Sequence, residues 1–209
     1  MIAVPPVKKP LTVGIYLFAD VEVLDFAGPY AVFTTASRVF RQTAPASPEP
    51  FTVCTISSSG VPIRARAGLL VQPDHGLDRH PSLDVLIVPG GVVTAELAEP
   101  GVLRWIANVA RSTTITASVC TGAFLLAKAG LLAGRSVTTH WEDADDLKAM
   151  LPDLTVQTGV RWVDEGPVVT SAGISAGIDM SLHLVERLAG RDLAVRTARQ
   201  MEFDWTENP

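Results

Sequence analysis

The chain has 209 residues and a formal net charge of −5, with 47% hydrophobic and 19% charged residues. This balance predicts a folded core and excludes a disordered protein, which needs few apolar and many charged residues. The sequence contains no run of five basic residues and no stretch near the roughly 20 apolar residues of a membrane span. We therefore expect neither nucleic acid nor a membrane among its partners.

Two cysteines, Cys54 and Cys120, allow at most one disulfide bridge, so we expect reduced thiols in a cytoplasmic protein. Cys54 lies in a strand pattern and is expected in the core. Residues 1–10 contain three prolines and are expected to form a disordered lead. The apolar run after them is only about eight residues long and reads as a first strand, not a signal peptide. Residues 11–209 are expected to form a single domain.

Strands and helices alternate along most of this domain. In chain order, the patterns predict a strand at 11–18, a helix at 25–40, a strand at 51–56, a strand pair at 61–71, a strand at 83–88, a helix at 95–110, a strand at 113–119, a helix at 123–129, a short strand at 135–139, a helix at 141–150, two or three short strands within 155–170, and helices at 178–188 and 193–201. Such alternation predicts an α/β fold, with a mostly parallel sheet and helices on both faces. Functional sites in these sheets form at the carboxyl ends of the strands.

Cys120 joins a predicted strand directly to a predicted helix. A sharp turn of this kind, a nucleophile elbow, exposes a reactive side chain at the top of the sheet. Ser118 and Gly122 on either side are small, as the crowded backbone requires. The positive end of the following helix favours a thiolate. We therefore predict a reactive thiol with a lowered pKa, against the alternative of a small buried hydrophobic residue.

The turn Pro89-Gly90-Gly91 follows another predicted buried strand. Glycines allow a backbone N–H to approach a ligand closely. One N–H from Gly90 or Gly91 and one from Thr121 are candidates to hold a developing negative charge. The alternative is an ordinary strand-ending turn.

Three acids follow the first predicted strand. Asp25 lies close to a helix start, where it either caps the helix or shuttles protons to a nearby thiol. Asp20 and Glu22 are expected to be solvated loop charges.

The four histidines are spread along the chain. His75 and His80 lie in a polar loop and are expected to be exposed, whereas His183 is expected to be structural. His140 follows Cys120 by 20 residues and, as an isolated histidine, is more often structural than catalytic. Because no cluster has metal-ligand spacing, we expect no metal and no cofactor.

Four segments, at 23–33, 84–91, 117–141 and 168–190, carry a family resemblance. They resemble the ThiJ/PfpI superfamily, which has a class I glutamine amidotransferase-like fold. The resemblance implies a three-layer, flavodoxin-like sandwich. Leu-Asp-x-x-Gly-Pro at 24–29 and Ser-Val-Cys-Thr-Gly at 118–122 are similar to the branch of isonitrile hydratases and amidase-like domains of AraC-type regulators.

The resemblance assigns roles to several residues. It implies that Cys120 is the nucleophile and that Asp25 is the acid beside it. Thr121 would supply an oxyanion N–H and a hydroxyl contact, while Gly90 and Gly91 would shape the opposite wall. The resemblance also implies a homodimer.

Three functions follow as alternatives. The first is hydration of a small carbon–nitrogen compound, most concretely an isonitrile. The second is a ligand-sensing domain without catalysis, and the third is a glyoxalase- or chaperone-like stress protein. His140 falls where the superfamily often has a histidine near the cysteine, although its role differs between branches. Because only about twenty residues follow the last matching segment, we expect no helix-turn-helix region of the kind that AraC-type regulators carry.

Overall fold

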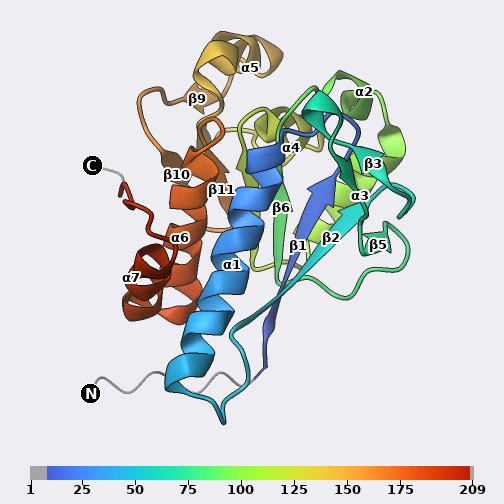
Figure 1. Ribbon diagram of the computed structural model, residues 1–209. Helices are drawn as coiled ribbons and strands as arrows, with labels where there is room; N and C mark the ends of the chain where they lie inside the picture. Colours follow the sequence, from blue (N-terminus) through green and yellow to red (C-terminus); the bar gives the residue numbers. More distant parts are fainter. Residues whose placement is uncertain (1–8, 208–209) are drawn as a thin grey trace.

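The computed structural model describes residues 9–207 (Figure 1). The predicted disordered lead therefore lies, apart from its last two residues, outside the described part of the chain.

A seven-stranded sheet forms the centre, in the order β10-β11-β7-β6-β1-β2-β5. Its strands are β1 (Leu11–Leu17), β2 (Phe51–Ser57), β5 (His75–Gly76), β6 (Val85–Val88), β7 (Ile115–Val119), β10 (Trp162–Asp164) and β11 (Val168–Ser171). All neighbours pair in parallel except β10, which runs antiparallel to β11. The mostly parallel α/β sheet is thus confirmed. The chain adds β2 on one side of β1 and β6 on the other, so the strand order reverses between β1 and β6.

Helices cover the sheet on both faces. On one face lie α1 (Val23–Thr43), α6 (Ala176–Ala189) and α7 (Arg191–Gln200), which pack on one another (Figure 1). A second group packs together behind the sheet, formed by α2 (Thr94–Leu97), α3 (Pro100–Ala110) and α4 (Gly122–Lys128). Every residue of β6 and β7 is buried, because both faces of these central strands are covered.

Two small elements flank the main sheet. The first is a hairpin of β3 (Ile63–Arg64) and β4 (Leu70–Val71), with the short 3-10 turn η1 (Arg66–Gly68) between them. The second combines the parallel strands β8 (Ser136–Val137) and β9 (Thr155–Val156) with the 3-10 turn η2 (Trp141–Asp143) and α5 (Ala144–Met150).

The predicted helix at 95–110 is wrong in one respect, because the structure divides it. α2 ends at Leu97, and α3 begins with Pro100 at its first position. Proline lacks an N–H and clashes inside a helix, but it is well tolerated at the first turn.

The polar loop that holds His75 and His80 also differs from its prediction. It contains β5, so His75 is half-buried rather than exposed. His80 is half-buried too, and its Nε2 accepts a hydrogen bond of 2.9 Å from the Trp105 indole. Cys54 is 6% exposed, which confirms its expected place in the core. Within residues 9–207, the helices are too short or too polar to cross a bilayer.

Candidate active site

Cys120 occupies the tight turn between β7 and α4. Its φ of 56° lies in the left-handed region, which residues other than glycine rarely adopt. Neighbouring segments hold the turn: the Cys120 N–H donates to the carbonyls of Ser171 and Ala172, and the Thr139 hydroxyl donates to the Cys120 carbonyl at 2.9 Å. A Cβ on Gly122 would lie 2.1 Å from the Val88 oxygen, so the close approach of α4 to β6 requires glycine.

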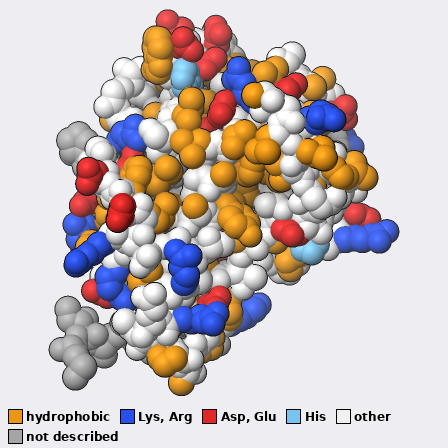
Figure 2. Space-filling model, in the orientation of Figure 1, with side chains coloured by type: hydrophobic (Ala, Val, Ile, Leu, Met, Phe, Trp, Pro, Cys, Tyr) orange, Lys and Arg blue, Asp and Glu red, His pale blue; other side chains and the backbone are white. Residues whose placement is uncertain are grey.

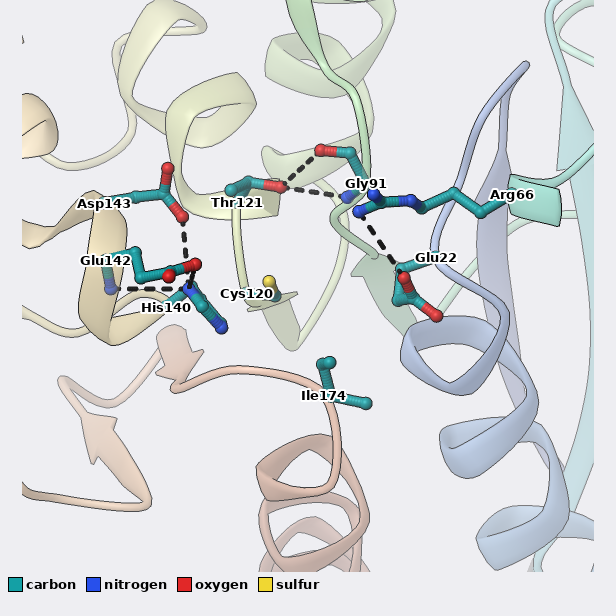
Figure 3. A pocket seen from close by; sticks show the side chains of 9 residues that line it. All are labelled: Glu22, Arg66, Gly91, Cys120, Thr121, His140, Glu142, Asp143 and Ile174. Atoms are coloured by element: carbon teal, nitrogen blue, oxygen red, sulfur yellow. Dashed lines mark hydrogen bonds and ion pairs between the residues drawn. The ribbon is translucent and has the colours of Figure 1, made fainter.

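The Cys120 side chain lines a cavity of about 330 Å³. The walls come from the loops after β1, β6, β7 and β11, together with η1 and η2 (Figure 3). The lining residues are Glu22, Arg66, Gly91, Cys120, Thr121, His140, Glu142, Asp143 and Ile174. Cys120 is 7% exposed, and Figure 3 shows its sulfur between Thr121, His140 and Ile174. The cavity therefore lies at the carboxyl ends of the strands, where a functional site was expected.

Asp25 lies fully buried in the first turn of α1, beside this cysteine. Its Oδ2 accepts a hydrogen bond of 3.0 Å from the Gly90 N–H. Its Oδ1 accepts no hydrogen bond from residues 9–207, and the thiol of Cys120 is near enough to lower the pKa of the carboxyl. The capping alternative is wrong, because Glu22 is the N-cap and its side chain accepts from the Val23 N–H.

Burial controls the acidity of this pair. It raises the pKa of Asp25 to about 7, and the Gly90 N–H offsets part of that rise. Burial also raises the pKa of Cys120 to about 12, helped by the charge of Asp25 and opposed by the N–H groups of Thr121 and Ile174. The pKa of Cys120 thus moves in the opposite direction to the predicted one, because desolvation and the charge of Asp25 outweigh the N–H groups of Thr121 and Ile174.

The two glycines of the opposite wall are close-packed against these groups. A Cβ on Gly90 would lie 2.6 Å from the Thr121 nitrogen and hydroxyl oxygen and 2.9 Å from Asp25 Oδ2. The Gly90 N–H donates to Asp25, and the Gly91 N–H donates to the Thr121 hydroxyl at 2.9 Å. That hydroxyl in turn donates to the Gly91 carbonyl. The expectation of a free N–H at Gly90 or Gly91 is thus wrong here, since both already have acceptors.

His140 lines the cavity from the side opposite Gly91 (Figure 3). Its Nδ1 lies 3.4 Å from Asp143 Oδ2 and accepts a long hydrogen bond from the Glu142 N–H. The ring packs so closely on Gly173 that a Cβ there would lie 2.1 Å from His140 Cδ2. Over the described residues, no hydrogen bond joins His140 to Cys120.

Several lining residues were missed by the sequence-based prediction. Glu22, expected to be a solvated loop charge, faces the cavity and lies 3.6 Å from the Arg66 guanidinium. Ile174 was not among the predicted site residues, yet its N–H lowers the pKa of the Cys120 thiol and its φ is 47°. The sequence holds no local signal for either residue, because their positions depend on loops that meet only after folding. Within residues 9–207, no cluster of His, Cys, Asp or Glu could hold a metal ion.

Comparison with known proteins identifies the family to which this chain is similar. The model of the DJ-1/PfpI family matches residues 11–187. An isonitrile hydratase from Pseudomonas putida is 35% identical over 195 residues, which cover 92% of this chain and 78% of the hydratase. A helix-turn-helix transcriptional regulator from Pseudomonas aeruginosa, CdhR, is 34% identical over 69% of this chain, but the match spans only 43% of the regulator.

A solved structure agrees with these matches. The crystal structure of a ThiJ/PfpI family protein from Pseudomonas syringae superposes with a TM-score of 0.84 and 26% identity, covering 99% of this chain and 80% of that one. These matches confirm the predicted three-layer sandwich and the resemblance of the sequence to the ThiJ/PfpI superfamily. The chain belongs to the DJ-1/PfpI family.

Proposed function

We propose that the protein is a cysteine-dependent hydratase of small carbon–nitrogen compounds, most concretely an enzyme that converts an isonitrile to an N-substituted formamide. One observation carries this proposal: a thiol at a strained turn faces a small cavity and is paired with a buried carboxyl whose pKa is about 7. A group with that pKa both accepts and donates a proton near neutral pH.

The first half of the reaction forms a covalent bond to sulfur. The Cys120 thiol loses its proton to the Asp25 carboxylate while sulfur attacks the terminal carbon of R–N≡C. Asp25 then returns this proton to the same carbon. The product is a thioimidate, R–N=CH–S–Cys120, and the carboxylate is regenerated.

The second half consumes one water molecule. Asp25 takes a proton from water as the oxygen bonds to the thioimidate carbon and passes that proton to the nitrogen, which gives R–NH–CH(OH)–S–Cys120 and regenerates the carboxylate. The carbon–sulfur bond then breaks, and the hydroxyl proton passes through Asp25 to the departing sulfur. The products are R–NH–CHO and the free thiol. The N–H groups of Thr121 and Ile174, which lower the pKa of the sulfur, stabilise its negative charge as it leaves.

The cavity favours a small substrate without negative charge. Its volume of about 330 Å³ suits a small molecule, and its lining carries three carboxylates against one guanidinium. An isonitrile is neutral, and the proton relay needs only Cys120, Asp25 and water.

A ligand-sensing role is the second candidate. The match to a regulator favours it, and so does a resting thiol with a pKa of about 12, since a protonated thiol suits binding without chemistry.

Turnover separates the two candidates. Purified protein is mixed with cyclohexyl isonitrile, and formamide production is followed by proton NMR. Cys120→Ser and Asp25→Asn are expected to abolish product while the fold survives. Cys54→Ser serves as the matched control, because Cys54 is a buried cysteine that does not line the cavity, and it is expected to retain activity.

Turnover by Cys120→Ser at the parental rate would remove the hydratase proposal. Binding without turnover by the parent favours the sensor, and lactate formed from methylglyoxal favours the stress-protein alternative.

We also propose that the protein forms a homodimer, as the family resemblance implies. Figure 2 shows hydrophobic side chains gathered over β1 and β2 beside α1, where Figure 1 shows no helix in front of the sheet. On α1, the exposed hydrophobic residues include Leu24 and Tyr30. An exposed apolar face of this kind is typical of protein contacts. Light scattering after size-exclusion chromatography is expected to give twice the chain mass for the parent and the chain mass for Tyr30→Glu. We also propose a cytoplasmic location, because both cysteines are free thiols.

A further inference from the structure

The segment from Ala172 to Ser175 carries a strained residue that faces the reactive sulfur. Ile174 has a φ of 47°, which is unfavourable for a β-branched side chain. Its N–H acts on the Cys120 sulfur and lowers the pKa of the thiol. Such strain persists only when the surrounding structure fixes the backbone. The contacts that hold this segment therefore affect the chemistry of the thiol.

Arg161 holds this segment at both ends. Its backbone carbonyl accepts a hydrogen bond of 2.9 Å from the Ala172 N–H. Its guanidinium Nη2 donates to the Ser175 hydroxyl at 3.2 Å. Ile174 lies between these two attachment points, although Arg161 itself does not line the cavity.

The guanidinium is itself fixed by a buried carboxylate. Asp179 on α6 is fully buried, and its Oδ2 accepts hydrogen bonds from Nη2 and, at 2.8 Å, from Nε of Arg161. Its Oδ1 accepts from the Thr206 N–H at 2.8 Å. A buried carboxylate is costly unless it is paired in this way, so the Arg161 side chain has little freedom to move.

We propose that Arg161 is a positioning residue for the reactive site. Anchored by Asp179, it holds residues 172–175 so that Ile174 keeps its place beside Cys120 in the cavity wall. The inference deepens the proposed function, because the Ile174 N–H stabilises the sulfur during the proposed hydration. Its test does not require that function, since it reads the reactivity of the thiol directly.

The experiment measures alkylation of Cys120 by iodoacetamide at pH 8, with mass spectrometry of the peptide that contains residue 120. Only the thiolate reacts, so the rate follows the stabilisation of the charged sulfur. Arg161→Met is expected to slow alkylation about tenfold, the effect of one lost hydrogen bond to a charged group. Ser175→Ala, which leaves the Arg161–Asp179 pair intact, is expected to slow it about threefold.

Arg187→Met is the matched control. Arg187 on α6 also pairs with a carboxylate near the sheet edge, Asp164, at 2.8 Å, but it does not touch residues 172–175. Its alkylation rate is expected to equal that of the parent. A loosened loop alone exposes a buried sulfur and accelerates alkylation, so slowing distinguishes positioning from a merely structural role.

The outcomes decide the proposal in each case. Unchanged or faster alkylation in a folded Arg161→Met variant would overturn the proposed role of Arg161, whatever Ser175→Ala shows. If Arg161→Met does not fold, Ser175→Ala alone decides. Where isonitrile turnover is present, kcat is expected to fall in both variants with KM unchanged. Absence of turnover in the parent would refute the hydratase proposal and leave the alkylation result standing.

Discussion

The pH dependence of kcat/KM tests the proposed proton relay most directly. In that relay, Asp25 must be ionised to take the proton from the Cys120 thiol. Burial raises the pKa of Asp25 to about 7, so the competent form is lost as pH falls through that value. The ionised fraction rises from about 0.1 at pH 6 to about 0.9 at pH 8 for a pKa of about 7. We therefore expect kcat/KM for a neutral isonitrile to rise about tenfold across this interval.

The assay is initial-rate formamide production from pH 5.5 to 8.5 at constant ionic strength. The pH–rate profile of kcat/KM reports the groups of the free enzyme, so substrate binding does not shift the inflection. A rate that falls through pH 7 would mean that the protonated acid is required, which would refute the relay. A flat profile would mean that Asp25 does not titrate in this range. Asp25→Asn is expected to form no measurable formamide at any pH in this range, because it lacks the group that takes the proton.

Three further predictions concern stability and specificity. Because burial raises the pKa of Asp25 from 3.8 to about 7, the folded state disfavours its ionised form, and stability falls as pH rises between those values. Asp25→Asn is thus expected to raise the unfolding free energy at pH 8 by about 4 kcal/mol at most, with little gain at pH 4, as measured by urea titration. Glu142→Gln combined with Asp143→Asn removes two carboxylates from the cavity lining. At low salt, the ratio of kcat/KM for a carboxylate-bearing isonitrile to kcat/KM for a neutral one is expected to rise up to about fivefold. If this ratio is unchanged, the carboxylates do not set the charge preference of the cavity. Gly173→Ala is expected to lower the unfolding free energy by about 1–3 kcal/mol, because its Cβ would overlap the His140 ring, and the double variant with His140→Ala is expected to recover most of it.

The order of strands and helices and the turn at Cys120 could be predicted from the sequence, because the signals for them are local. Buried parallel strands read as continuous apolar runs, and the small residues around Cys120 mark a turn that tolerates little bulk. The break at Pro100 was also readable from local rules, and the prediction of one long helix across it ignored the missing N–H.

The acidity of the site was not predictable in the same way. The direction of the Cys120 pKa depends on burial by distant segments and on the nearby charge of Asp25, 95 positions earlier in the chain. The local pattern offered only the helix end, which is the weaker effect here. Ile174 and Glu22 were missed for a related reason, since each faces the cavity through a loop whose path is set by tertiary contacts.

The two raised pKa values together define how this site produces a nucleophile. Burial raises the pKa of both Asp25 and Cys120, and each group acts on the other, so the pair loses its protons in coupled steps, with the charge of Asp25 opposing ionisation of the thiol. A permanently ionised thiolate reacts with any oxidant or electrophile that enters the cavity. A thiol that ionises only by transfer to a buried carboxylate reacts when a substrate carbon accepts the sulfur and then the proton. The selectivity of the site therefore depends on transfer of the thiol proton from Cys120 to Asp25. Removing the carboxylate is expected to reduce isonitrile turnover far more than alkylation by iodoacetamide, because iodoacetamide takes no proton from Asp25.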